Sequence, residues 1–263
     1  MKISLVMATF ERSFQLALGL GSITYKYNHL DLEIIVVDDG MFSEEKYSAK
    51  YWCDSYRKSG LNIKYIFAGQ RNVNGIVKRN PCFANNIAVK QSSGDIIVLS
   101  CPEIYHINNG LDLLIEPLLK DKKLLTIPEF MYFEDTDGGD AISFSGYMTK
   151  GYNDTLLPLL RLDKESVQMP FFMGMWKDEF MKIGGYDEDM RGYAGDDNDL
   201  VDRLQWNGCR YFRTGAGIVH LYHGPRCDSQ EHFENPAWVY NYNVRKAGRG
   251  KIVRNVGREW GVL

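Results

Sequence analysis

The first hundred residues alternate short apolar runs with polar segments of helical pattern. Continuous apolar runs that alternate with helices are typical of a mainly parallel sheet covered by helices. The sequence therefore predicts an α/β, Rossmann-like fold. The predicted strands are 3–7, 33–37, 63–67 and 96–99, and the predicted helices between them are 12–20, 43–57 and 83–90.

Polar residues follow the first, second and fourth of these strands. In a parallel sheet, ligands bind beyond the carboxyl ends of the strands, so Thr9, Asp38, Asp39 and the residues after Leu99 are expected on one edge. A carboxylate at a strand end can accept a hydrogen bond from a nucleobase N–H or a ribose hydroxyl. Gly40 allows a sharp turn past such a ligand.

A second feature is the acidic cluster Gly195-Asp196-Asp197-Asn198-Asp199-Leu200. Leu200, Val201 and Leu204 follow at helical spacing, so the cluster is predicted to begin a helix. One interpretation is a helix N-terminus capped by acidic side chains. The other is functional, because neighbouring carboxylates repel and a site that holds them together commonly binds a cation or takes a proton.

The segment 174–208 resembles the acceptor and catalytic region of GT-A glycosyltransferases, in particular the galactosyltransferase C-terminal type. The resemblance lies in Gly174, a helix at 177–183, the pair Gly184-Gly185, Tyr193 and the acidic cluster. In the amino-terminal half, Thr9-Phe10-Glu11-Arg12 and Val36-Val37-Asp38-Asp39-Gly40 resemble the paired motifs of glycosyltransferase family 2.

The resemblance covers residues 2–224 and implies a GT-A fold and an enzyme that moves a sugar from a nucleoside diphosphate sugar to an acceptor hydroxyl. A UDP-sugar is the expected donor, and a glycan or another hydroxyl compound is the expected acceptor. The chain is interpreted as one domain, 1–263. It has a donor half at 1–106, an acceptor and catalytic half at 107–224 and a basic extension at 225–263.

The resemblance assigns the general base to Asp197. Inverting relatives carry an acid at this position and retaining polypeptide transferases tend to carry Asn, so Asp197 favours inversion. Direct displacement at an anomeric carbon needs a carboxylate behind the acceptor oxygen. The family motif has Glu where this chain has Asp196, which is expected to bind acceptor hydroxyls, and Asn198 replaces a third acid.

The donor is expected to contact both early motifs and the start of the helix near residue 83. The resemblance implies that Asp38 contacts the base and that Arg79 approaches the diphosphate, because a planar guanidinium can bond two phosphate oxygens. An exposed arginine at a helix start is the alternative. The predicted donor-binding residues are Thr9, Phe10, Arg12, Asp38, Asp39, Arg79 and Asn85.

The usual Asp-x-Asp metal motif is absent after the fourth predicted strand, where the chain reads Ser-Cys-Pro-Glu-Ile-Tyr-His. Glu103 and His106 are competent ligands there, and His220 and His223 match the spacing of a distal ligand motif in galactosyltransferase-like enzymes. Histidines combined with a carboxylate suit Mn²⁺, so a divalent cation, Mn²⁺, is predicted at these four residues.

The acceptor is expected against aromatic faces. Trp176, Tyr193 and Gly174 are the predicted acceptor-binding residues, and a position in the core is the alternative for either aromatic. Other hypotheses are a retaining polypeptide N-acetylgalactosaminyltransferase-like enzyme, a catalytically inactive GT-A domain that binds a sugar or nucleotide, and a nucleotidyltransferase.

Composition limits the partners and the location. The net charge of −3 provides no general attraction to nucleic acid or to a membrane surface. The extension carries six basic residues from Arg245 to Arg258, interpreted as a solvated tail, with contact to a polyanion or a nucleic-acid acceptor as the alternative. Five cysteines without a paired motif and no apolar segment of membrane-spanning length indicate a cytoplasmic protein without membrane insertion.

Overall fold

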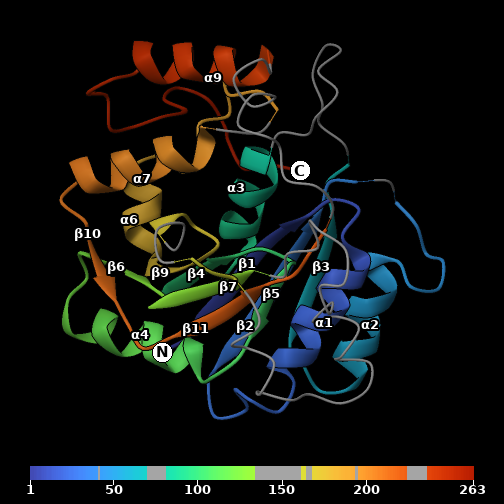
Figure 1. Ribbon diagram of the computed structural model, residues 1–263. Helices are drawn as coiled ribbons and strands as arrows, with labels where there is room; N and C mark the ends of the chain where they lie inside the picture. Colours follow the sequence, from blue (N-terminus) through green and yellow to red (C-terminus); the bar gives the residue numbers. More distant parts are fainter. Residues whose placement is uncertain (41, 70–80, 134–160, 164–167, 193–194, 224–235) are drawn as a thin grey trace.

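The structure is a computed structural model that describes residues 1–40, 42–69, 81–133, 161–163, 168–192, 195–223 and 236–263. Its amino-terminal half alternates strands and helices as predicted (Figure 1). The elements in this half are β1 (Ile3–Thr9), α1 (Ser13–Ile23), β2 (Leu32–Asp38), α2 (Ala49–Lys58), β3 (Ile63–Phe67), α3 (Pro81–Gln91), β4 (Ile96–Ser100) and β5 (Ile104–His106).

The second half contains shorter strands and the helices around the acidic cluster. Its described elements are α4 (Gly110–Lys120), β6 (Leu124–Ile127), β7 (Phe130–Phe133), β8 (Arg161–Asp163), β9 (Phe172–Trp176), α6 (Lys177–Lys182), α7 (Asp196–Trp206), β10 (Arg210–Arg213), β11 (Gly217–His220) and α9 (Pro236–Ala247). The helix predicted to begin at the acidic cluster is α7.

Among the described residues, one sheet has the strand order β10-β6-β9-β4-β1-β2-β3. β1 pairs in parallel with both β2 and β4, and β9 runs antiparallel to β4 and β6. A smaller sheet has the order β5-β11-β7-β8. The predicted α/β fold with a mainly parallel sheet flanked by helices is therefore confirmed.

The strand order creates a topological switch point between β1 and β4. From β1 the chain proceeds outward to β2 and β3, and it then returns across the sheet through α3 to β4 on the other side of β1. Because crossovers are right-handed, this reversal places α3 on the opposite face from α1 and α2. The crevice beyond the carboxyl ends of β1 and β4 is where open α/β sheets bind ligands.

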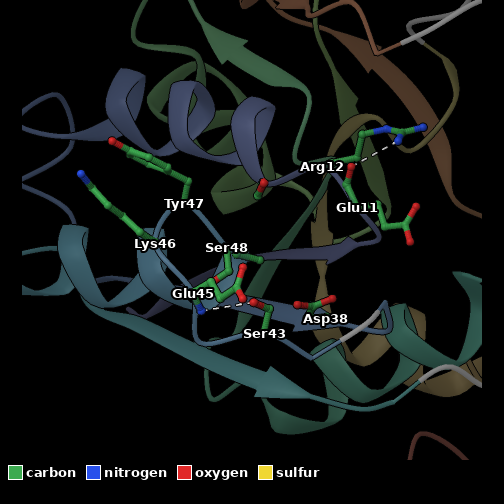
Figure 2. Close-up of a pocket in the computed structure, with 10 residues that line it drawn as sticks. Glu11, Arg12, Asp38, Ser43, Glu45, Lys46, Tyr47 and Ser48 are labelled. Atoms are coloured by element: carbon green, nitrogen blue, oxygen red, sulfur yellow. Dashed lines mark hydrogen bonds between the residues drawn. The ribbon is translucent and has the colours of Figure 1, made fainter.

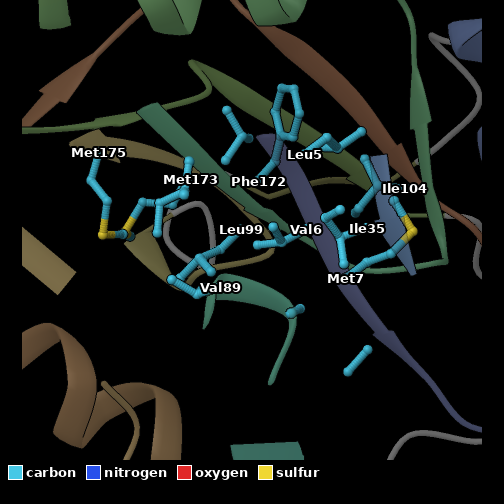
Figure 3. Packing of buried hydrophobic residues seen from close by; sticks show 14 of the residues in the cluster. Leu5, Val6, Met7, Ile35, Val89, Leu99, Ile104, Phe172, Met173 and Met175 are labelled. Atoms are coloured by element: carbon cyan, nitrogen blue, oxygen red, sulfur yellow. The ribbon is translucent and has the colours of Figure 1, made fainter. Parts of the chain in front are cut away.

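The inner strands of the large sheet, β6, β9, β4, β1 and β2, are buried on both faces, which explains their continuous apolar runs, whereas the edge strands β3 and β10 are partly exposed. Leu5, Val6, Ile35 and Leu99 are at most 2% exposed and pack in one core with Met173 of β9 (Figure 3). Burial at roughly 25 cal/mol per Å² of apolar surface is the main force that holds helices against such a sheet.

Two segments differ from the sequence prediction. The helix predicted at 43–57 begins only at Ala49, because Ser48 caps it by accepting a hydrogen bond from the backbone N–H of Tyr51 at 3.1 Å. The turn-rich, acidic sequence of 128–151 predicts a mobile loop, but its start forms β7, and the part from 134 onward lies outside the described residues.

The basic extension is not a solvated tail in its described part, which corrects the first interpretation. Arg254 is 8% exposed and pairs with Asp187 and Asp199. Asn255 donates to the backbone carbonyls of Gly184 and Tyr186, each at 2.8 Å. The extension packs against the segment that carries the glycine pair and α7, and α9 lies beside α7 in Figure 1. None of the described helices has the length and apolar character needed to span a membrane.

Candidate active site

A cavity of about 230 Å³ opens at the carboxyl ends of β1 and β2. Its wall contains Glu11 and Arg12 from the segment after β1, Asp38 from the end of β2, and the segment before α2 (Figure 2). The remaining lining residues are Ser13, Ser43, Glu45, Lys46, Tyr47, Ser48 and Ala49. The predicted edge of the sheet therefore carries a real cavity.

Asp38 is the most firmly held of the predicted donor-binding residues. Its Oδ2 accepts a hydrogen bond from the hydroxyl of Tyr65 at 2.8 Å, and its Oδ1 accepts from the backbone N–H of Gly40 at 3.0 Å. The side chain is buried, and burial together with Asp38 raises the pKa of Tyr65, so the phenol remains a donor. These bonds fix the orientation of the carboxylate before any ligand binds.

The backbone is constrained around this cavity. Glu11 and Tyr47 have φ values of 53° and 74°, and both belong to the small set of described non-glycine residues with positive φ. Such conformations cost roughly 1–3 kcal/mol each and cluster at binding sites. Glu45 and Tyr47 were not predicted as site residues because 43–57 was assigned to a helix, and Glu11 was predicted only as part of the motif after β1. Ser48 is of a residue type favoured at helix N-caps, and this signal could have predicted that α2 begins after it and that a loop precedes it.

The other predicted donor residues have different positions. Thr9 is 0% exposed and Asp39 is 5% exposed, and neither is among the residues that line the cavity. Both are therefore buried at this edge of the sheet, behind the cavity wall. Asn85 is half-buried on α3, where its neighbour Asn86 is the residue that bonds to Tyr186. Phe10 is half-buried beside the cavity wall. Arg79 lies outside the described residues.

Two of the four predicted metal ligands, Glu103 and His223, contact Arg12, and a third, His220, lies beside His223. The Arg12 Nε lies 3.3 Å from Oε1 of Glu103, and its Nη2 lies 3.4 Å from Nδ1 of His223. The ring centroids of His223 and His220 are 5.2 Å apart. Pairing of β5 with β11 produces this arrangement, because His220 is opposite Ile104.

His106 does not have the surroundings of a metal ligand, which corrects the fourth assignment. The side chain is 1% exposed, and its Nδ1 lies 3.1 Å from the hydroxyl of Tyr27. Its ring packs edge-on against Phe172, with centroids 4.7 Å apart. Burial lowers the pKa of His106 to about 3, and Lys26 acts in the same direction. His106 is therefore a neutral core histidine.

The donor atoms of Glu103, His220 and His223 are of the kind that bind a divalent cation. Within the described ranges, however, no three His, Cys, Asp or Glu side chains are close enough together to hold a metal ion. The guanidinium of Arg12 lies between Glu103 and His223. The three residues fit a metal by their chemistry, and Arg12 must leave before they can surround one.

The acidic cluster begins α7 through a left-handed glycine. Gly195 has φ 81° at the N-cap position, a conformation that costs a residue with Cβ roughly 1–2 kcal/mol. In the first turn, Asp197 is half-buried and its Oδ1 accepts a hydrogen bond from the hydroxyl of Tyr186 at 3.0 Å. Tyr186 is buried, and burial followed by the charges of Asp197 and Asp196 raises its pKa, so it remains a donor.

Asp197 lies near the start of α3, at the same edge of the sheet as the cavity. α3 follows β3 and therefore begins near the carboxyl edge. Its second residue is Cys82. Burial is the largest cause of the raised pKa of the Cys82 thiol, and the nearby charges of Asp196 and Asp197 raise this pKa further. Asn86 of α3 also binds the Tyr186 backbone through both ends of its amide. Through α3, the acidic cluster is attached to the edge that carries the cavity.

The acceptor assignments are not supported for two residues. Trp176 pairs with Ile96 at the opposite end of β4 from this edge, and its Nε1 donates to the Leu118 carbonyl at 2.8 Å. Gly174 lies inside the sheet, where a Cβ would come within 2.5 Å of the Thr126 Oγ1, so glycine is required there by packing. Tyr193 lies outside the described residues.

The family model described as the N-terminal domain of galactosyltransferase matches residues 171–224. Chondroitin sulfate synthase 3 of Homo sapiens and that of Mus musculus are each 33% identical to the chain over 55 residues, which are 20% of this chain and 6% of theirs. The chain therefore matches only a small part of these relatives. All of the predicted acceptor and catalytic cluster falls within the matched segment.

Solved structures resemble nearly the whole chain. GalNAc-T7 with UDP, GalNAc and Mn²⁺ has a TM-score of 0.61 at 13% identity, covering 87% of this chain and 45% of its own. S. aureus TarS has a TM-score of 0.55 at 16% identity, covering 85% and 36%. The mannosyltransferase PcManGT from Pyrobaculum calidifontis, with GDP-Man and Mn²⁺, has a TM-score of 0.55 at 13% identity, covering 94% and 61%.

The fold and the position of the cavity define the chain as a GT-A fold protein, the class to which these glycosyltransferases belong. Its segment 171–224, which carries the glycine pair and the acidic cluster, is the part that matches the galactosyltransferase family model. The predicted resemblance to GT-A glycosyltransferases is confirmed.

Proposed function

We propose that this chain is a glycosyltransferase that moves a sugar from a nucleoside diphosphate sugar to an acceptor hydroxyl with inversion, and that Asp197 is the general base. The observation that carries the proposal is the half-buried Asp197 carboxylate, which accepts a hydrogen bond from the Tyr186 hydroxyl at 3.0 Å near the start of α3, at the edge of the sheet where the cavity opens. A base in this position can take the proton of an acceptor hydroxyl as it attacks.

The cavity is the proposed donor site. Asp38 offers a fixed acceptor for a nucleobase N–H, and Arg12 offers an N–H fork to the diphosphate. A UDP-sugar is the proposed donor, in line with the UDP bound by the GalNAc-T7 neighbour. Acidic side chains in the wall favour the neutral, hydrogen-bonding parts of the ligand, so the phosphates are expected at the Arg12 side.

The proposed cation is Mn²⁺, held by Glu103, His220 and His223. When bound, such a cation offsets the negative charge that develops on the leaving diphosphate. Two structural neighbours contain Mn²⁺ together with their nucleotides.

Calorimetric titration of UDP-, GDP- and dTDP-sugars, each with Mn²⁺ and with chelator, tests the donor site. We expect one nucleotide to bind preferentially and the variant Asp38→Asn to bind it at least about tenfold more weakly, because a carboxylate oxygen becomes an amide donor. If none of the nucleotides binds, the proposed activity fails and an inactive domain with another ligand is favoured.

Transfer itself is tested by Asp197→Asn. Loss of a general base costs about 10²–10⁴-fold in turnover, while donor affinity is expected to stay within about twofold, because the base acts only in the transition state. Asp202→Asn is the matched control on the same helix, since Asp202 pairs with Arg245 and not with Tyr186. Substantial transfer by Asp197→Asn would remove Asp197 from this role.

The alternative is a retaining transferase, favoured by the fold similarity to GalNAc-T7. Product stereochemistry distinguishes the two. NMR of the first product formed gives the anomeric configuration directly, and retention would contradict the inverting proposal while leaving the donor site unaffected.

A further inference from the structure

Arg12 belongs both to the cluster of predicted metal ligands and to the wall of the proposed donor cavity. Its guanidinium bridges Glu103 and His223, and the same residue lines the cavity proposed for the donor. The Glu103 side chain is 12% exposed and the Arg12 side chain is 32% exposed, so the ion pair is shielded from solvent on the Glu103 side. Arg12 therefore stands at the boundary between the ligand cluster and the cavity.

The position of Arg12 follows from the fold. Arg12 lies between β1 and α1, directly before Ser13, and Glu103 lies between β4 and β5, so the pair spans the switch point between β1 and β4. Gln15 of α1 donates to the backbone carbonyl of Tyr222 at 2.8 Å, which keeps the segment carrying His223 beside α1. The contact between Arg12 and its two partners is therefore held from both sides.

The atoms that contact Arg12 are those a metal ion would need. A guanidinium carries only N–H donors, so the His223 Nδ1 that faces it presents a lone pair. The Glu103 carboxylate is the anionic ligand of the same cluster. A divalent cation and the guanidinium cannot share these atoms, and their like charges repel at this distance.

We propose that Arg12 is an internal cation that occupies the Glu103 and His223 ligand atoms in the absence of donor and competes there with a divalent metal ion. This inference rests on the proposed donor and metal sites. An anionic diphosphate in the cavity draws the guanidinium toward itself, which frees Glu103 and His223 for the metal. Donor and metal thus bind cooperatively, and by linkage each raises the affinity for the other by the same factor.

The test is a titration of purified full-length chain with MnCl₂ alone, with free Mn²⁺ measured by electron paramagnetic resonance. The variant Arg12→Gln is expected to bind Mn²⁺ about tenfold more tightly than the wild type, because a neighbouring positive charge is removed. The matched control is Arg57→Gln, which removes an equal charge from the ion pair with Asp54 on α2 and is expected to leave the affinity unchanged.

Two further variants make the result specific. Adding Glu103→Gln to Arg12→Gln is expected to abolish the gain, and a gain that survives would place the metal elsewhere and overturn the proposal. If Arg12→Gln does not fold, Arg12→Met replaces it, because methionine also removes the positive charge and keeps an aliphatic stem of similar length. Unchanged or weaker Mn²⁺ binding in the folded variant overturns the proposal.

The cooperativity has its own measurement. Addition of UDP is expected to raise the Mn²⁺ affinity of the wild type by a larger factor than it raises the Mn²⁺ affinity of Arg12→Gln. Equal factors would contradict the proposed competition. These readouts do not use sugar transfer. A chain that shows the competition but transfers no sugar would refute the proposed function alone, whereas an active transferase without it would refute only this inference.

Discussion

Arg254 forms a buried ion pair with Asp199 of α7, with its Nη2 3.0 Å from the Asp199 Oδ1. The side chains are 8% and 2% exposed. Arg254 also places its Nε 2.8 Å from Asp187, and Arg203 occupies the second oxygen of Asp199 at 2.6 Å. A residue of the basic extension is thus part of the interior beneath the helix that carries Asp197.

We expect Arg254→Met to lower the free energy of unfolding by about 3–5 kcal/mol, because it leaves the buried Asp187 carboxylate without its cation and removes one of the two arginines that pair with Asp199. Arg258→Met is the control. Arg258 pairs with the exposed Asp189, and loss of an exposed pair costs about 1 kcal/mol or less. Urea denaturation measures both variants, and equal losses would show that burial of the Arg254 pair is not what stabilises the extension.

The Tyr186 hydroxyl is expected to matter for transfer beyond its packing. Tyr186→Phe keeps the buried ring but removes the hydrogen bond to Asp197. A donor to a carboxylate favours its ionised form, so without this hydrogen bond the acidic limb of the kcat/KM profile should move to higher pH. Tyr242→Phe, at an exposed position on α9, should leave this limb unchanged. An unshifted acidic limb would mean that Tyr186 does not act on the proposed base.

Stability should depend on pH through His106. Burial lowers the pKa of this side chain to about 3 from an ordinary 6.5. Between these values the unfolded chain binds a proton that the folded chain excludes, so the stability contributed by the neutral ring is complete above pH 6.5 and is lost as the pH falls toward 3. One proton corresponds to about 1.4 kcal/mol per pH unit.

His106→Phe preserves the contact with Phe172 and removes this proton. Its free energy of unfolding should therefore fall less steeply than that of the wild type between pH 6 and 4, measured by denaturation at each pH. His29→Gln serves as the control, because His29 is exposed on the surface beside Asp112. Identical slopes for His106→Phe and the wild type would rule out a buried neutral imidazole.

The glycine pair is expected to be required by the extension. Gly184 has φ 73°, and a Cβ there would collide with the backbone carbonyl of Arg254, which a side-chain rotation cannot relieve. Gly208 has φ 87° with no atom within 4 Å of such a Cβ. Gly184→Ala should therefore lower the melting temperature clearly more than Gly208→Ala, whose cost is limited to backbone strain of roughly 1–2 kcal/mol. Similar shifts would mean that the extension yields to accommodate the methyl group.

Periodicity along the chain was sufficient to predict the strands up to β4, the helices between them and the start of α7. Each of these elements depends on local patterns: apolar runs, Gly195 and the acidic residues of the first turn. The edge with Asp38 was also predictable, because parallel strands place their carboxyl ends together.

The sequence by itself determined the class of fold and the candidate base, because strand and helix patterns and the Gly195–Asp199 motif are contained in short segments. Tertiary structure alone decided which candidates meet. It brought Arg12 between Glu103 and His223, enclosed His106 in the core, and placed Trp176 at the far end of β4. These outcomes depend on strand order, register and the docking of the extension, which join residues distant in the chain. Such contacts leave no local pattern in a single sequence.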